Sequence, residues 1–448
     1  MRDVWRIGME RLTLERAQPP WTVPLPSRHF ADRLHRFDWL SDLVSQGAAG
    51  QERAAGFVDS WIEAFGTFNG FAWRAEPTAH RLWNWMRCSN VLFAEGYPPE
   101  RMECLMRQMR YLSEVLDQTT NPRTRWMGSC LMVARSVCLD GAHRLDEALA
   151  RLDGECTAQI LPDGGHVSRS PARLLTSLLN LLALQEVLQK AGHLVPDYFD
   201  KWIARMGAML AFFQTEDGAL NPFNDGDEAR PEVVAAALDR LSAPPRRFTF
   251  APKSGFQKLQ KGSLRLVLDC GEAPPPPFGD YAHAGALGFE LSDGPARLVT
   301  SCGYSAEVNV DWQAAVRTGA HSTLVLAGRD SSNFVTNEET RLLAAMGPEG
   351  ISAKRLEESD EIWLDAQHGG YKAACGLLHR RRLFMSGDGS RLTGEDSLVR
   401  PISQPPSDDN KFINFEIRFH LHPTVTAMMG RDAIRLICDN GAVWRFKT

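Results

Sequence analysis

The chain has 448 residues, of which 44% are hydrophobic and 23% are charged, and its formal net charge is -5. This length and composition predict an ordinary globular protein of two or three domains with an ample apolar core. The small negative charge gives no reason to expect a nucleic-acid partner, because phosphate binding favours a basic face. An anionic polymer could still bind through local arginines.

The N-terminus and the cysteines bear on the compartment. Residues 1–10 carry charges where a signal peptide needs an uninterrupted apolar core, and no stretch approaches the length needed to cross a bilayer. Nine cysteines are scattered without CxxC pairs, a pattern typical of reduced thiols. We therefore expect a cytoplasmic protein, with a periplasmic location as the alternative. The sequence does not indicate an oligomeric state.

The first half of the chain has the hydrophobic period of helices. An arm of residues 1–27 precedes an all-α domain that we place at residues 28–245. Apolar residues follow a helical stripe over residues 174–188, and Gly192 is placed to end that helix. Residues 127–137 are apolar on nearly every side, which is typical of a helix enclosed by others. Short turns between such segments indicate antiparallel helix pairs, and a toroid is one arrangement open to them. No tight sequence repeat marks a toroid, so the periodicity itself predicts only an all-α half.

The second half changes to a period of two after the Pro-rich break at residues 242–247. Leucines alternate with other side chains over residues 264–269, and aromatic and aliphatic residues do so over residues 415–421. The Ser/Gly/Asp run at residues 386–390 has the composition of a turn between strands. We therefore predict an antiparallel β-sandwich over residues 246–448, and an α+β multidomain protein as a whole.

Two histidines in the second half suggest a site. His283 and His321 each follow small residues at the edge of an alternating apolar run, so both imidazoles can be held at strand ends in a cleft. The proline-rich residues 273–280 cannot continue a strand. We expect them to form a rigid loop that delivers Tyr281 and His283 to the junction of the two domains.

The order of several motifs resembles that of the heparinase II/III-like polysaccharide lyases over roughly residues 30–448. The motifs are those around His283 and His321, the His368-Gly-Gly-Tyr371 turn, the His379-Arg-Arg-Arg382 strand and the Asp163-Gly-Gly-His166 to Ser170-Pro171 segment. The resemblance implies an (α/α) toroid packed against a β-sandwich with a substrate groove between them. It also implies lyase chemistry on a uronate-containing polysaccharide or oligosaccharide.

The implied reaction is β-elimination, which removes the C5 proton of a uronate and expels the O4 oxygen. The carboxylate must be neutralised, a base must take the proton, and an acid must protonate the leaving oxygen. The family tyrosine after Ser-Pro falls on Arg173, which stays protonated and so cannot be a base. We expect Arg173 to bind the uronate carboxylate, helped by Asn121, which falls near the family's Asn-His.

The candidates for proton transfer are His283, the best match, together with Tyr281 and His166. Tyr304 and Tyr371 are the other phenols of this half, and a tyrosine base would need a strongly lowered pKa. For substrate binding we name four residues that accompany this machinery. They are Arg317, His321, Tyr371 and Trp126.

Some relatives hold a structural zinc ion on two histidines and an aspartate. The histidines fall here on His283 and His321, whereas the aspartate position reads Ser301, and the adjacent Cys302 offers a thiolate in its place. Side chains alternate along a strand, so Cys302 should point away from the face of Ser301 unless a bulge intervenes. The elimination itself requires no cofactor. We therefore expect no metal, with zinc on His283, His321 and Cys302 as the alternative.

Structural interpretations compete with each of these roles. His379, His420 and His422 fit hydrogen-bonded positions on a polar sheet face, and Trp126 fits a helix core. The tyrosine missing at Arg173 motivates a second hypothesis, a non-catalytic glycan-binding or cell-envelope assembly protein on the same scaffold. A hydrolase with a remodelled His/Cys metal centre is a third.

Overall fold

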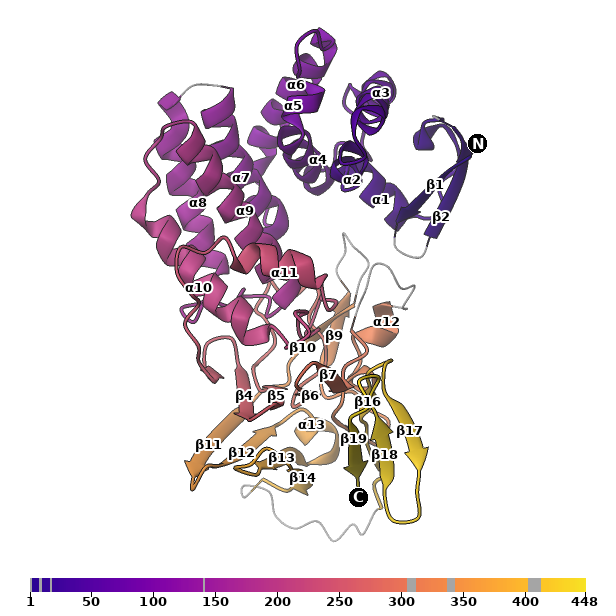
Figure 1. Cartoon of the computed structure of the whole chain (residues 1–448), viewed down its shortest axis with the longest axis vertical. Coiled ribbons are helices and arrows are strands. Elements are labelled where there is room, and N and C mark those ends of the chain that lie inside the picture. The colour runs from indigo at the N-terminus through magenta and orange to yellow at the C-terminus, as the bar shows by residue number, and fades with distance from the viewer. Residues whose placement is uncertain are drawn as a thin grey trace. The chain divides into compact units, whose positions relative to one another are not determined.

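The computed structural model of the chain describes residues 2–7, 10–16, 18–139, 142–303, 312–336, 343–401 and 412–448 (Figure 1). The chain divides into two compact units. The first holds the described residues of 1–157 and 183–195, and the second those of 158–182, 196–304 and 310–448. Among the described residues, no helix has both the length and the apolar character needed to cross a membrane.

The first unit begins with an antiparallel hairpin and continues as helices. The hairpin strands are β1 (Arg2–Ile7) and β2 (Glu10–Glu15). The helices are η1 (Pro20–Thr22), α1 (Arg28–Arg36), α2 (Leu40–Val44), α3 (Ala48–Phe65), α4 (Ala75–Arg87), α5 (Ser89–Leu92), α6 (Pro99–Leu116), α7 (Pro122–Cys138), η2 (Ala142–Arg144) and α8 (Leu145–Gln159), whose last two residues belong to the second unit.

Capping residues and an aromatic core explain where these helices begin and how they pack. The Ser27 side chain accepts a hydrogen bond at the start of α1, and the Asn121 side chain does so at the start of α7, where proline follows as the first helical residue. Trp61 and Trp85 are fully buried and meet edge to face, with ring centroids 5.8 Å apart. The helical first half is therefore confirmed.

The second unit adds helices that precede or interrupt its strands. α9 (Pro171–Lys190) is shared, because its residues 171–182 belong to this unit and its remainder to the first. The others are α10 (Asp197–Phe213), α11 (Pro231–Leu238), α12 (Trp312–Ala315), η3 (Thr318–Ala320) and α13 (Lys372–Cys375). α9 carries the apolar stripe expected over residues 174–188, and Gly192, with a φ of 76°, follows its end as expected.

All strand pairs described in the second unit are antiparallel. The largest sheet has the order β16-β7-β6-β5-β4-β3 and a second has the order β11-β12-β13-β14. Smaller sheets are β17-β18-β19, β10-β9 and β15-β8. The bounds are β3 (Phe250–Ala251), β4 (Phe256–Lys261), β5 (Leu264–Asp269), β6 (Phe289–Asp293), β7 (Ala296–Thr300), β8 (Leu324–Leu326), β9 (Asn333–Thr336), β10 (Leu343–Met346), β11 (Ser352–Glu358), β12 (Glu361–His368), β13 (Leu378–Met385), β14 (Leu392–Val399), β15 (Phe415–Ile417), β16 (His420–Leu421), β17 (Thr426–Met429), β18 (Ile434–Ile437) and β19 (Val443–Phe446).

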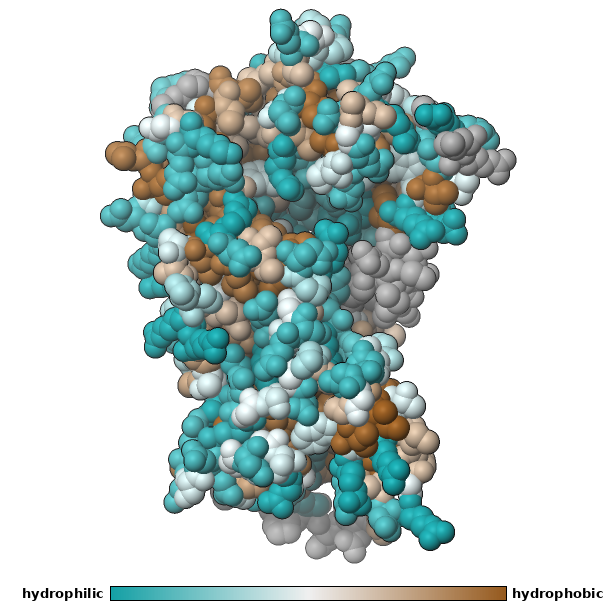
Figure 2. Space-filling view, viewed as in Figure 1, coloured by the Kyte–Doolittle hydropathy of each residue, from teal (hydrophilic) through white to brown (hydrophobic). Residues whose placement is uncertain are grey.

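One apolar core joins the two largest sheets. Leu266 and Phe289 of the six-stranded sheet pack in the same cluster as Ile362, Leu364 and Leu383 of the four-stranded sheet. Two antiparallel sheets sharing an inner apolar layer form a sandwich, as the alternating sequence predicted. Outside this core, Figure 2 shows apolar surface over the C-terminal strands β17 to β19, where Met428, Met429 and Val443 are exposed.

The predicted strand over residues 415–421 is divided in the structure. β15 ends at Ile417 and pairs with β8, whereas β16 begins at His420 and pairs with β7 of another sheet. The chain therefore passes from one sheet to the next at Arg418 and Phe419. The alternation continues across this crossing, which is why the sequence indicated a single strand.

Candidate functional site

The segment before α9 is fixed by its glycines and by Asp163. The Asp163 carboxylate accepts hydrogen bonds from the backbone N–H groups of Lys253 and Ser254, both at 2.8 Å. Gly164 has a φ of 92°, and a Cβ atom there would lie 2.0 Å from the Arg205 carbonyl oxygen, so only glycine fits this turn. His166 is buried, and its Nδ1 lies 2.7 Å from the Ser168 hydroxyl.

Arg173, in the first turn of α9, is held by an acidic residue that no sequence motif had indicated. Its Nη2 lies 2.6 Å from Oδ2 of Asp225, and both side chains are mostly buried. The Ser170 hydroxyl donates a hydrogen bond to the Asp225 carbonyl and accepts one from the Arg173 backbone N–H. The Arg173 guanidinium also lies 4.5 Å from the centre of the Tyr281 ring. Arg173 and Tyr281 thus belong to one cluster.

Asn224 connects this cluster to His283. Its side-chain amide donates to the Arg169 carbonyl at 2.9 Å and accepts from the His283 backbone N–H at 3.2 Å. Arg169 and Asn224 both have positive φ angles, of 59° and 53°. Such backbone conformations are uncommon outside glycine and often occur at functional sites. The polar Asn-Asp pair of residues 224–225, in the loop after α10, was the sequence signal that could have pointed to both partners.

His283 and His321 form a buried imidazole pair. Their ring centroids lie 5.3 Å apart, and Gly285 lies directly against the His321 ring. Burial lowers the pKa of His283 to about 3, and burial together with His283 and His420 lowers the pKa of His321 well below its usual value. Both rings are therefore neutral near pH 7. A neutral imidazole whose pKa is this low is a weak proton acceptor.

Cys302 contacts His420, which is neither of the two histidines named in the alternative zinc site. Its sulfur lies 3.5 Å from Nδ1 of His420, and Nε2 of that ring lies 2.9 Å from the Gly319 carbonyl oxygen. Within the part of the chain that the structure describes, no three His, Cys, Asp or Glu side chains come together in a way that could hold a metal ion. The arrangement gives no support to zinc on His283, His321 and Cys302, and no chemical step is assigned to a metal.

Tyr371 lies in the core and not in a groove. Its side chain is fully buried, its hydroxyl donates to the Leu324 carbonyl at 2.7 Å, and burial raises its pKa far above the usual value. The expected contact between Tyr371 and a substrate is therefore not possible in this structure. Arg317 is half-exposed and pairs with Asp330 at 2.8 Å. Tyr304 lies outside the described residues.

The two candidates from the helical domain have structural positions within the first unit. Oδ1 of Asn121 accepts hydrogen bonds from the backbone N–H groups of Arg123 and Thr124, and so caps α7. Trp126 is only 4% exposed, which fits the helix-core interpretation and leaves no face for a sugar. Neither residue belongs to the cluster formed by Arg173, Tyr281, His283 and His321.

His379 is also buried, in a hydrogen-bonded row, and not on a polar sheet face. Nε2 of His368 lies 3.1 Å from Nδ1 of His379, whose Nε2 lies 2.7 Å from Oδ1 of Asp396. The Gly370 N–H donates to Nδ1 of His368, which fixes the direction of the row. His379 thus has the hydrogen-bonded position that the structural interpretation expects, but it lies in the core. His420 and His422 also have hydrogen-bond partners, the Gly319 carbonyl and Glu228.

Comparison with known proteins agrees with this architecture. The model of the heparinase II/III-like C-terminal family matches residues 243–448. The chain is 34% identical over 421 residues to FtsZ-localized protein C of Caulobacter vibrioides, covering 92% of this chain and 73% of that protein. No enzymatic activity is stated in that name.

Solved structures that resemble this chain include a heparinase and a heparan sulfate lyase. A crystal structure of heparinase III has a TM-score of 0.70 at 13% identity and covers 96% of this chain and 72% of that chain. A mutant of the heparan sulfate lyase HepC from Pedobacter heparinus has a TM-score of 0.59 at 14% identity, covering 98% and 72%. At these identities the likeness concerns the fold, and it confirms the expected order of a helical domain and an antiparallel β-domain. The chain belongs to the heparinase II/III-like family.

Proposed function

We propose that this chain is a non-catalytic member of its family that acts in assembly of the cell envelope, in association with FtsZ. The observation that carries the proposal is the ion pair between Arg173 and Asp225. Arg173 occupies the position that resembles the family tyrosine, and Asp225 already neutralises its charge. The similarity to FtsZ-localized protein C supplies the biological context.

The other side chains of the cluster support the same conclusion. Elimination requires a base whose pKa lies near the working pH, and the carboxylate of the substrate must meet an available cation. His283 and His321 both have strongly lowered pKa values, and Tyr371 is buried with a raised pKa. A uronate would have to displace Asp225 to reach the Arg173 guanidinium. Each of these conditions works against rapid proton abstraction.

The test combines an activity assay with a binding assay. The full-length protein is incubated with heparan sulfate, hyaluronan and chondroitin sulfate, and the ultraviolet absorbance of unsaturated uronate is followed. We expect no absorbance above that of a buffer blank, and we expect the same protein to co-sediment with FtsZ filaments. Release of unsaturated uronate by the wild type and its loss in His283→Gln would overturn the proposal. Failure to co-sediment would remove the FtsZ association.

Polysaccharide lyase activity is the second candidate, because Arg173, Tyr281 and the imidazole pair belong to one compact unit. In this mechanism Arg173 would bind the uronate carboxylate, and Tyr281 or His283 would take the C5 proton. The C5–H and C4–O4 bonds break, a C4–C5 double bond forms, and the leaving oxygen receives a proton. The same absorbance assay decides between the candidates, with Arg173→Gln expected to abolish turnover if this mechanism holds.

A further inference from the structure

The face of the six-stranded sheet opposite the sandwich core carries buried cations. Lys258 on β4, Arg265 on β5 and Arg297 on β7 are each less than a tenth exposed. The register pairs Gln260 with Arg265 and Ser292 with Arg297, so these side chains lie on one face, which alternates with the apolar one. Buried charges are costly unless they are paired, so each of the three cations should have a counter-ion.

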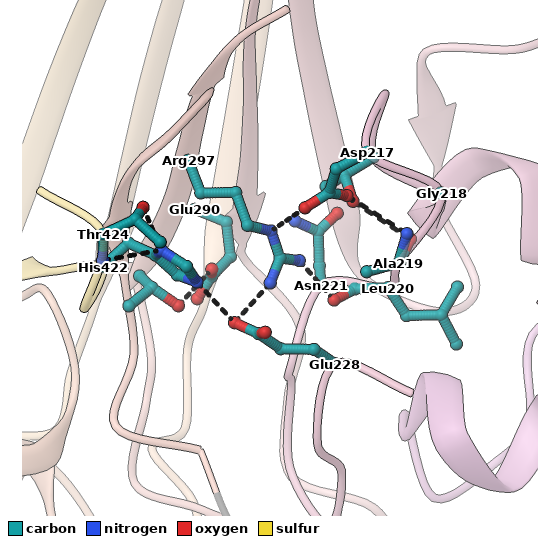
Figure 3. Close-up of polar contacts among 12 residues, drawn as sticks. Asp217, Gly218, Ala219, Leu220, Asn221, Glu228, Glu290, Arg297, His422 and Thr424 are labelled. Carbon is teal, nitrogen blue, oxygen red and sulfur yellow. Dashed lines mark hydrogen bonds and ion pairs between the residues drawn. The ribbon is translucent and has the colours of Figure 1, made fainter. Parts of the chain in front are cut away.

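Arg297 has its counter-ions. Its guanidinium pairs with Glu228 and lies 3.5 Å from Asp217, and it donates to the Leu220 carbonyl (Figure 3). Glu228 also lies 3.1 Å from Nε2 of His422 (Figure 3). This cation is therefore fully accounted for as a structural element that fixes the loop after α10 to the sheet.

Lys258 and Arg265 contact neutral acceptors instead. Nζ of Lys258 donates to the Phe212 carbonyl at 3.3 Å, while Arg265 donates to the same carbonyl at 2.6 Å and to the Asn221 side chain at 3.0 Å. In the described residues no carboxylate lies within ion-pair distance of either cation. Burial and the neighbouring Arg265 lower the pKa of Lys258 to about 7. Two like charges thus share one neutral acceptor.

A cavity of about 710 Å³ lies over these two side chains, wholly within the second unit. Arg246 and Arg247, from the exposed segment after α11, also line it. The lining contains four cationic groups and two carboxylates, Glu216 and Asp239, and across the described chain no ion pair joins the two sets. The volume suits a ligand of sugar or nucleotide size. None of its lining residues belongs to the Arg173 and His283 cluster.

We propose that this cavity binds a small organic anion, whose carboxylate or tetrahedral oxyanion lies between Lys258 and Arg265 and is contacted from the solvent side by Arg247. The anion would supply the counter-charge that Asp217 and Glu228 supply to Arg297. Cation–oxyanion hydrogen bonds in a partly enclosed pocket are the stronger kind, and lysine with arginine is a common pair for such groups.

A purely structural role is the competing explanation. Phe212 lies in the last turn of α10, where unpaired carbonyl groups and the negative end of the helix dipole attract cations. A capping role predicts that removal of Lys258 destabilises the protein and changes no ligand affinity. A binding role predicts that removal of Lys258 weakens ligand binding and leaves stability unchanged or higher. The reason is that replacement of an unpaired buried charge by an apolar side chain is often neutral or stabilising.

The charges around Lys258 also predict how binding should depend on pH. Arg265 on β5, Arg247 in the segment after α11, and Glu216 and Asp239 at the helix ends face the cavity. Arg355 of β11 contacts the Lys258 backbone but is paired with Glu357. Burial lowers the pKa of Arg265 only to about 10, so this guanidinium keeps its charge at neutrality. Lys258 is charged mainly below pH 7, so affinity for an anion should fall as the pH rises.

The experiment is isothermal titration calorimetry of the full-length protein with glucuronate, with sulfate and with glucose as the neutral control. Glucuronate and sulfate keep their charges between about pH 6 and pH 8, so a change in affinity reports on the protein. We expect saturable binding of at least one anion, no binding of glucose, and affinity that falls up to about tenfold from pH 6 to pH 8. Preference for glucuronate or for sulfate identifies the kind of oxyanion.

Three variants make the test specific. Arg247→Gln changes an exposed side chain and should weaken binding several-fold without affecting folding, whereas Lys258→Met should weaken it by about tenfold or more and abolish the pH dependence. Lys201→Met, at an exposed position on α10, is the matched control and should bind as the wild type does. The proposal is overturned if neither anion binds, or if Lys258→Met and Arg247→Gln bind as tightly as the control.

Discussion

Asp396 is the residue on which a buried polar network depends. Its carboxylate accepts hydrogen bonds from Nε and Nη2 of Arg381, at 2.8 and 2.9 Å, and lies 2.7 Å from the His379 ring. Arg381 in turn donates to the carbonyls of Leu287 and of Ser322, the residue that follows His321 in the chain. Since all three charged or polar side chains are nearly inaccessible, the network can be satisfied only internally.

We predict that Asp396→Ala lowers the free energy of unfolding by about 3–5 kcal/mol, because it leaves the Arg381 guanidinium buried without a counter-ion. Urea denaturation followed by circular dichroism measures this loss. Glu395→Gln, the neighbouring residue on β14 with an exposed partner, is the matched control and should leave stability nearly unchanged. Equal stability of the two variants would show that Arg381 finds other partners.

At the scale of elements, the start of α7 separates a structural role of Asn121 from a catalytic one. The side chain caps the helix, so Asn121→Ala should cost about 1 kcal/mol, while Asn121→Asp and Asn121→Ser should retain most of the stability. Urea denaturation of the three variants gives the comparison. If Asn121 bound a uronate instead, all three substitutions would impair binding of acidic glycans whatever their effect on stability.

The elements that the sequence predicted well are those whose burial follows their own period. α9 and α10 have apolar stripes at helical spacing, and β5 alternates, so their type could be derived locally. The surroundings of the polar face of the six-stranded sheet could not be derived locally. Alternation placed Arg265 opposite the core, as if toward water, but the loop after α10 covers it. That cover comes from a distant part of the chain, which periodicity does not report.

The site was predicted in part for the same reason. His283, His321, Tyr281 and Arg173 were named from their types and motif order, and the structure places all four in one compact unit. Their partners at residues 224 and 225 lie in the loop after α10, where a polar pair is common and carries no motif. Tyr371 was assigned to the substrate as one of the phenols of the second half, although its ring fills the core and its hydroxyl has a backbone acceptor.

At the scale of the whole molecule, buried neutral histidines determine the response to acid. Among the described histidines whose pKa is lowered, burial is the first cause in each, and six of them are the most deeply buried. They are His35, His80, His283, His321, His368 and His379. In the unfolded chain each takes up a proton near its usual pKa of about 6.5, whereas the folded protein does so only at lower pH. The unfolded state therefore binds more protons in between, and stability falls as the pH decreases.

The magnitude is large enough to unfold the protein in mild acid. Each such histidine contributes a loss of about 1.4 kcal/mol per pH unit below about pH 6.5, until its folded pKa is reached. Burial raises the pKa of Glu290 to about 8, so above the usual pKa of a glutamate the folded state binds one more proton at this group than the unfolded state does. Glu290 therefore makes the protein more stable as the pH decreases, but it is one group acting against six histidines. At about pH 5 the summed loss of unfolding free energy from six histidines is comparable with the usual stability of a folded domain, about 5–15 kcal/mol. We predict acid unfolding between about pH 4 and pH 5.5.

The proton count gives a test that does not depend on the absolute stability. The slope of the unfolding free energy against pH is measured by urea denaturation from about pH 5 to pH 6.5. Divided by about 1.4 kcal/mol per pH unit, it gives the number of protons taken up on unfolding. His35→Leu removes one buried imidazole, although it also removes the acceptor of the Trp61 N–H, so it should destabilise the protein at about pH 7.5. The slope of this variant should nevertheless decrease by about one proton, because a leucine side chain cannot titrate in either state. An unchanged slope would mean that His35 is already protonated in the folded protein, against the direction set by its burial beside Arg81.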